Sequence, residues 1–223
     1  MKFFNKKIII YSAKDKIFTF PILYQISKLL SKKYKIDIYL GETNYKRKIK
    51  ILLVFALFGS MPGLVKLFFK RVELKKILKL KGVNIVNDVN KKKYKFGISL
   101  FFTKKIIQKN YPIFNLHLGN FKNQRGSFIF FYKFLYNWNH LDLTFHKINE
   151  IFDAGPILFK KKIKIKSMNA TDICSIYLHN INFIKKSITT IENKLKIKKN
   201  KTIGKLNIEP SFFLILKTFF KIK

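Results

Sequence analysis

Cysteine, arginine and acidic residues are scarce in this sequence of 223 residues. The single cysteine, Cys174, excludes an intramolecular disulfide and a zinc site built from cysteine pairs. A chain of this length buries roughly 70% of the surface that its unfolded state exposes, so one domain needs no covalent support. The 48% of apolar residues, among which are 25 phenylalanines, excludes an intrinsically disordered chain.

The shortage of acidic residues leaves a strongly positive chain, because 11 Asp and Glu stand against 47 Lys and Arg, for a net charge of +36. Only Arg47, Arg71 and Arg125 are arginines, although a protein that grips phosphates would use the bidentate guanidinium group. Lysine, asparagine, isoleucine and phenylalanine are abundant together, a pattern that A/T-rich codons produce. We therefore assign most of the charge to nucleotide composition. The remainder predicts attraction to a polyanion, either nucleic acid or an anionic membrane face.

Long hydrophobic runs are absent as well. The most apolar segment is residues 49–69, and its uncharged part, 51–65, is shorter than the ~18–20 residues of a membrane-spanning helix. Gly59, Pro62 and Gly63 interrupt it, so we expect a broken pair of buried helices. Two other interpretations stay open, namely a basic and aromatic surface that rests on a membrane, and a true span.

Short β-branched runs alternate with helical patterns over the first half of the chain. A strand at 6–11, too short for the apolar core of a signal peptide, is followed by helical spacing over 17–33 and a second strand at 36–40. Strand, helix and strand with short connections predict a right-handed crossover and a parallel sheet. Further strands are expected at 83–86, 96–102, 113–117 and around 144–146, and further helices near 72–81 and 169–194.

These elements predict an α/β fold with an open, mostly parallel, Rossmann-like sheet flanked by helices. Such sheets bind ligands beyond the carboxyl ends of their strands, which directs attention to residues 102–107 and 115–126. We expect a catalytic domain over residues 1–166. Residues 167–223 would add a helix, a lysine-rich link and a basic-aromatic tail at 212–223 that packs on or near this domain.

The polar residues that can carry chemistry lie between positions 115 and 155. Asn115 and His117 are two residues apart on an expected strand, so their side chains point to the same face. Arg125, His146 and Asp153 follow, the last of them in an Asp-Ala-Gly turn. An amide and an imidazole can stabilise an oxyanion, and a carboxylate can orient the imidazole and accept a proton, so the set suits acyl transfer.

This pattern resembles the family of formyltransferases that use 10-formyltetrahydrofolate. The match covers about residues 96–160. The resemblance implies a formyltransferase fold and direct transfer of a formyl group to an amine, with no covalent enzyme intermediate and no metal. Four parts of the family signature are found in register: Asn115-x-His117, Arg125-Gly126, Thr144-x-His146 and Asp153-x-Gly155.

The resemblance also implies a role for each matched residue. Asn115 and His117 would polarise the formyl carbonyl, while Asp153 would pair with His117 and help to remove the proton from the attacking amine. A substrate-binding set is implied on the acceptor side, formed by Arg125, Gly126 and His146. The pteridine of the formyl donor would lie between two loops that contribute Lys105, Ile106, Ile107, Asn149, Glu150, Ile151 and Phe152.

The loop after His117 departs from the family. Residues 118–122 lack the two prolines of the family pattern, and Asp142 stands where a glycine precedes the Thr-x-His stretch. The reacting residues are intact, but the acceptor side is reshaped. An inactive homologue that serves as a membrane-surface or anion-binding protein therefore stays open as an alternative.

The family that the sequence resembles includes enzymes with at least three different acceptor amines. The turn after the first strand, residues 11–16, has no glycine, which argues against the phosphoribosyl acceptor of a glycinamide ribonucleotide formyltransferase. About 60 residues follow Phe159, fewer than the C-terminal domain that methionyl-tRNA formyltransferases add, although the basic surface would suit tRNA. We expect an amino-sugar nucleotide or a similar small, anionic acceptor in cell-envelope glycan synthesis. The protein would be cytoplasmic, with peripheral contact to the inner face of the membrane as an option, and its oligomeric state stays open.

Overall fold

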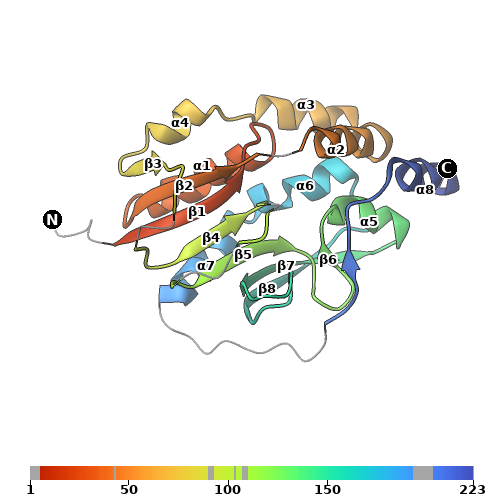
Figure 1. Ribbon diagram of the computed structural model, residues 1–223. Helices are drawn as coiled ribbons and strands as arrows, with labels where there is room; N and C mark the ends of the chain where they lie inside the picture. The colour runs from red at the N-terminus through yellow and green to blue at the C-terminus, as the bar shows by residue number, and fades with distance from the viewer. Residues whose placement is uncertain are drawn as a thin grey trace.

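The computed structural model describes residues 6–42, 44–89, 93–102, 104–106, 110–192 and 203–222. Its centre is a seven-stranded sheet flanked by helices (Figure 1). The first five strands across the sheet run parallel, the sixth runs in the opposite direction, and the seventh is antiparallel to the sixth, so the predicted mostly parallel α/β sheet is confirmed. In sheet order the strands are β3 (Val83–Ile85), β2 (Lys35–Gly41), β1 (Lys7–Ala13), β4 (Gly97–Leu100), β5 (Ile113–Leu118), β7 (His140–Lys147) and β8 (Ile157–Lys164).

The strands in the middle of the sheet are buried on both faces. In β1, Ile8 and Ile10 contribute to the core on one face and Ile9 and Tyr11 to the core on the other, and none of the four is more than 2% exposed. A β-branched run without polar alternation is typical of a strand covered on both sides. Because β1 pairs in parallel with both of its neighbours, the carboxyl ends of these strands lie at one edge of the sheet, where the functional side chains lie.

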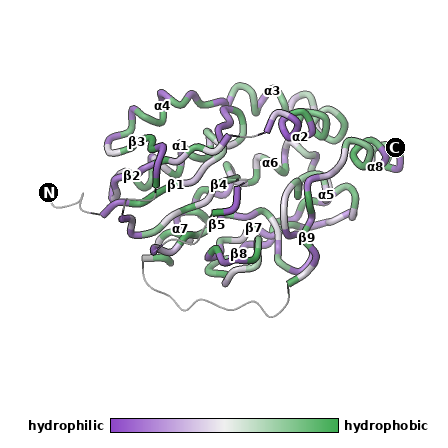
Figure 2. The backbone as a smooth tube through the Cα atoms, in the orientation of Figure 1, coloured by the Kyte–Doolittle hydropathy of each residue, from purple (hydrophilic) through white to green (hydrophobic). Residues whose placement is uncertain are grey.

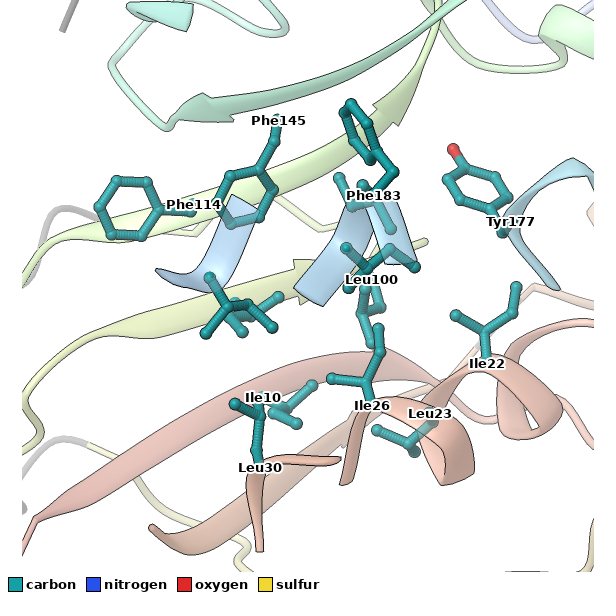
Figure 3. Packing of buried hydrophobic residues seen from close by; sticks show 14 of the residues in the cluster. Ile10, Ile22, Leu23, Ile26, Leu30, Leu100, Phe114, Phe145, Tyr177 and Phe183 are labelled. Carbon is teal, nitrogen blue, oxygen red and sulfur yellow. The ribbon is translucent and has the colours of Figure 1, made fainter. Parts of the chain in front are cut away.

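Helices α1 (Thr19–Leu30), α6 (Ala170–His179) and α7 (Ile181–Glu192) contribute to the larger core on one face of the sheet. Their apolar side chains pack directly on those of β1, β4, β5 and β7, so α6 and α7 complete the core that the strands begin. Figure 3 shows this packing for Ile10, Ile22, Leu23, Ile26, Leu30, Leu100, Phe114, Phe145, Tyr177 and Phe183.

A second cluster joins helices at one end of the molecule. Phe55, Phe131 and Ile215 are at its centre, and they come from α2 (Tyr45–Phe58), α5 (Ile129–Leu135) and α8 (Phe212–Ile222). Helix α8 packs on α2 and α5, α3 (Met61–Phe69) packs on α6, and α4 (Leu74–Leu78) packs on α1. The expected basic-aromatic tail is therefore mostly a docked helix.

A two-stranded parallel sheet connects the middle of the chain to its last part. It pairs β6 (Arg125–Gly126) with β9 (Leu206–Asn207). We call residues 203–209, which contain β9, the strap. The hydroxyl of Tyr132 donates to the carbonyl of Ile208 in the strap at 2.7 Å. These contacts bring the strap to the carboxyl edge of the main sheet.

Three elements differ from the expectations. The helix expected over 169–194 is two helices, because the chain turns at Asn180, whose Nδ2 donates to the carbonyl of Ile176 at 2.7 Å. The strand expected over 96–102 ends at Leu100, because Phe101 takes a left-handed φ of 54°. The helix expected near 72–81 is only the five-residue α4.

The apolar segment 49–69 forms two helices that are broken after Phe58, but the expectation of a buried pair is wrong. Helix α2 buries three side chains and α3 buries only Leu67, while most of the other apolar side chains of both helices reach solvent. In the part of the chain that the structure describes, no helix is long and apolar enough to cross a bilayer.

Candidate active site

Asp153 is the centre of a buried polar cluster. Its Oδ1 accepts a hydrogen bond from Nδ2 of Asn115 at 3.0 Å, and its Oδ2 accepts one from the backbone N–H of Gly126 at 3.0 Å. Nδ1 of His117 lies 3.6 Å from Oδ2, and Nε2 of His146 lies 3.6 Å from Oδ1. One carboxylate therefore contacts an amide, a backbone N–H and two imidazoles.

Strand register brings these groups together. The antiparallel pairing of β5 and β7 places His146 directly opposite Asn115, and His117 follows Asn115 by two residues on the same strand face. Asp153 lies in the turn after β7 with a left-handed φ of 44°, a conformation that aspartate adopts more readily than most residues. The site is thus built from strand ends of the rigid sheet together with one turn.

The surroundings of Asp153 and His117 shift the pKa of each group and so determine its charge. Burial alone would raise the pKa of Asp153, but His117, His146 and the N–H of Gly126 outweigh it and hold the pKa of this carboxyl below its usual range. Burial lowers the pKa of His117, although Asp153 and the carbonyl of Gln124 oppose this shift. At neutral pH the site therefore pairs an ionised carboxylate with a neutral imidazole.

The tautomer of His117 follows from its other partner. Nε2 of His117 lies 2.8 Å from the backbone carbonyl of Gln124. Because a carbonyl can only accept, Nε2 must carry the proton. Nδ1 then presents its lone pair near Asp153, and it is the ring nitrogen that can take up a proton.

The loop after His117 is held by side-chain hydrogen bonds. The buried Gln124 donates through Nε2 to the carbonyl of His140 at 2.9 Å, and its Oε1 accepts from the N–H of Asn120 at 3.2 Å. Asn120 in turn accepts through Oδ1 from two backbone N–H groups of the same loop, each at 3.0 Å. A Cβ at Gly119 would lie 2.7 Å from Nε2 of His117, so only glycine leaves room for the ring.

Arg125 is 7% exposed and binds backbone carbonyls. Its Nε and Nη2 donate to the carbonyl of Phe152 at 3.2 and 2.7 Å, and its Nη1 donates to the carbonyl of Gly204 in the strap. The guanidinium thus ties the residue before Asp153 to the strap, and it lines neither of the two cavities described next.

Two cavities meet at the polar cluster. The smaller, of about 50 Å³, is lined by the 104–106 and 148–153 loops together with His146. The larger, of about 420 Å³, is lined by His117, Gly126 and residues of α2, α6 and the strap. Asn115 and Asp153 line both cavities, and so do Phe102 and Phe152. A group held in one cavity can therefore reach a group held in the other only at this shared wall.

The larger cavity is mainly apolar away from the polar cluster, with Phe18, Phe55, Phe101, Phe128 and Phe130 among its lining residues. Three charged side chains outside the cluster also line it, and each has a partner. Asp15 accepts from the N–H groups of residues 17 and 18, and Arg47 pairs with Glu209 of the strap at 2.9 Å.

No protein-family model matches the sequence, and no curated protein matches it. Solved structures do match. A 4-N formyltransferase from Francisella tularensis is similar over 91% of this chain and 76% of its own, with a TM-score of 0.63 and 18% identity. An N-formyltransferase from Helicobacter canadensis, solved with folinic acid and dTDP-3-aminofucose, is similar over 92% and 71%, with a TM-score of 0.64 and 17% identity. HypX from Aquifex aeolicus, solved with tetrahydrofolic acid, is similar over 93% of this chain and 30% of its own, with a TM-score of 0.60 and 13% identity.

The fold is that of the formyltransferases. On this formyltransferase fold, the structure brings together most of the residues singled out in the sequence. Asn115, His117, Gly126 and His146 all contact or approach Asp153, whereas Arg125 lies beside them, bound to carbonyls. Of the residues expected to hold the donor, Lys105, Ile106, Asn149, Glu150, Ile151 and Phe152 line the smaller cavity, and Ile107 lies outside the described residues.

Two parts of the site have little or no signal in the sequence. Gln124 orients His117 through its carbonyl, and the only signal for it is a polar residue just before the Arg-Gly pair. The strap lines the larger cavity through residues 206–209. A two-residue strand has no periodicity, so β9 carries no pattern that would reveal it.

Proposed function

We propose that this protein is a folate-dependent formyltransferase, which transfers the formyl group of 10-formyltetrahydrofolate to a primary amine. The observation that carries the proposal is the shared wall of the two cavities, where Asn115 and Asp153 can touch both reactants. The fold, and the folate compounds present in two of the similar structures, support the donor. The proposed transfer reaction uses no metal.

The smaller cavity is the donor side of the proposal. Its lining residues fit a flat, polar heterocycle, since Asn149 and Glu150 lie beside Ile106 and Phe152. Its volume of about 50 Å³ is well below the ~300–1,000 Å³ of small-molecule sites. The turn at 149–152 lines this cavity, and two of its side chains, Ile151 and Phe152, are about half exposed.

The chain's own residues can carry the proton and the charge of the reaction. The Asn115 amide donates to the formyl oxygen, which becomes an oxyanion when the amine nitrogen bonds to the formyl carbon. Asp153, ionised and adjacent, accepts the proton that the amine loses, directly or through Nδ1 of His117. The proton then passes to the departing nitrogen of the donor as its bond to the formyl carbon breaks, and the cluster returns to its starting state.

The larger cavity is the acceptor side. Its volume of about 420 Å³ is within the usual range for a small-molecule site. We propose an amino-sugar nucleotide or a similar amine as the acceptor, in cell-envelope glycan synthesis in the cytoplasm, because sugar N-formyltransferases are among the similar structures and one contains dTDP-3-aminofucose. Substrate binding by Arg125 would be indirect, through the strap and Phe152.

The test is a formylation assay. The protein is incubated with 10-formyltetrahydrofolate and a panel of amino-sugar nucleotides, and products are examined for the formyl mass increment. Asp153→Asn should lower the rate by at least ~10²-fold, the scale of a positioned acid–base group. Glu42→Gln, at an exposed acidic residue, is the matched control and should leave the rate unchanged. Failure to modify any acceptor in a broad panel would refute the enzymatic role, and full activity of the Asp153→Asn variant would refute the assigned mechanism.

A further inference from the structure

Helices α2, α3 and α8 expose a concentration of large apolar side chains. They lie at the same end of the molecule, where Figure 1 shows α2 beside α3 and α8 beside α2. In Figure 2 long stretches of these helices have the colour of hydrophobic residues. We call this surface the apolar–basic face. Its exposed apolar residues are Tyr45, Ile49, Leu52, Met61, Val65, Phe68, Phe69, Phe212, Phe213, Leu216, Phe220 and Ile222.

The exposure results from how each helix packs. Helix α8 buries Ile215 and Thr218 against its neighbours, and this orientation turns Phe213 and Phe220 outward, each 74% exposed. Helix α3 buries only Leu67, and its Phe69 is 82% exposed. More than half of the large apolar side chains that the described residues expose lie on these three helices. Exposed apolar side chains gathered on neighbouring helices at one end of a folded protein are a candidate interaction surface.

The charge on the same helices has a single sign. None of the three helices contains an aspartate or a glutamate. Exposed cations lie on these helices or directly after α3, and they include Lys46, Lys48, Lys66, Lys70, Arg71, Lys217 and Lys221. Aromatic and aliphatic side chains surrounded by lysines are the composition of helices that lie in the interface of an anionic bilayer.

We propose that the apolar–basic face docks this protein on an anionic lipid bilayer, with α3 and α8 lying in the plane of the interface. Phenylalanines such as Phe69 and Phe220 enter the boundary between head groups and acyl chains, and the lysine ammonium groups stay at the level of the lipid phosphates. The helices have 9 and 11 residues, too few to span. A second copy of the chain is a poorer partner, since it would bring an equal positive charge onto a face that already repels it.

Vesicle co-sedimentation tests this proposal with the whole chain. Vesicles of phosphatidylcholine with a quarter of phosphatidylglycerol are compared with pure phosphatidylcholine vesicles, at low salt and at 1 M salt. We expect binding to the anionic vesicles at low salt, and a remaining part of it at 1 M salt, where a Debye length of about 3 Å leaves little long-range attraction. Loss of all binding at 1 M salt would mean nonspecific charge attraction and would overturn the proposal, as would the absence of binding at low salt.

Matched variants separate the face from the rest of the surface. Phe69→Ser with Phe220→Ser should weaken partition by at least ~10-fold for each phenylalanine removed from the interface. The control, Leu78→Ser with Ile203→Ser, removes exposed apolar residues elsewhere and should bind like the unchanged protein. Circular dichroism checks that both variants are folded. Equal binding of the two variants would overturn the proposal. A different outcome would also overturn it, namely a dimer in sedimentation equilibrium that is lost in the Phe69→Ser and Phe220→Ser variant, together with no vesicle binding by the variant or the unchanged protein. Because these measurements need no formyl donor or acceptor, they stand or fall separately from the proposed reaction.

Discussion

Gln124 offers a sharp test of how the site is held. The Gln124→Met substitution keeps the length of the side chain and removes its polar atoms. In the unchanged protein, Nε2 donates to the carbonyl of His140 at 2.9 Å, while Oε1 accepts from the N–H of Asn120 at 3.2 Å and, more weakly, from the N–H of Asp142 at 3.4 Å. Each such hydrogen bond is worth about 1 kcal/mol, and a buried group left without a partner costs about 1–3 kcal/mol. Because methionine fills a similar volume, little is added by a cavity.

The expected loss for Gln124→Met is therefore about 2–4 kcal/mol in the free energy of unfolding, measured by urea denaturation at pH 7. Lys122→Met introduces the same residue at an exposed position of the same loop, so it is the matched control and should change stability by at most about 0.5 kcal/mol. If Gln124→Met were as stable as the Lys122→Met control, the loop would not depend on this side chain. The proposal that the Gln124 side chain holds this loop in place would then be wrong.

Three further predictions concern charge and reactivity. Since the folded state lowers the pKa of Asp153, its ionised form stabilises the fold above the unfolded pKa of about 3.9 and loses this effect as the pH falls. The stability difference between the parent and Asp153→Asn, from urea midpoints, should thus shrink between pH 6 and pH 3, and a constant difference would contradict the shift. Glu209→Gln removes ion pairs to Arg47 and Lys50, each 2.9 Å long and partly exposed, and should cost about 1 kcal/mol or less, with a smaller loss at 1 M salt. Burial raises the pKa of the Cys174 thiol, so iodoacetamide at pH 8 should label it much more slowly in the folded protein than in urea; equal rates would refute this.

The sheet and the reacting residues could be predicted because their signals are local. The apolar run of β1 has no polar alternation, and the two-residue spacing of Asn115 and His117 places both side chains on one strand face. The family resemblance then supplied Asp153, which is distant in sequence and adjacent in space. Local periodicity and one spaced motif were enough for the architecture and the polar centre.

The supports of the site could not be predicted in the same way. Gln124 acts through His140 and Asp142, which are on a different strand, so no short pattern links them. The strap reaches the site through backbone contacts, and backbone groups are the same in every sequence. The burial of the 49–69 segment was misjudged for another reason. Apolar content indicates that a helix avoids water on at least one side, and it does not say how many sides have a protein partner.

Two faces of helix α2 have different surroundings. Arg47, Ile51 and Phe55 recur at four-residue spacing and line the larger cavity, whereas Tyr45, Ile49 and Leu52 project outward on the apolar–basic face. Successive residues of a helix are rotated by about 100°, so inserting or deleting one residue in α2 would rotate both sets away from their present surroundings. One helix therefore forms part of the cavity wall and part of the outer surface of the protein. A change in its length alters both at once.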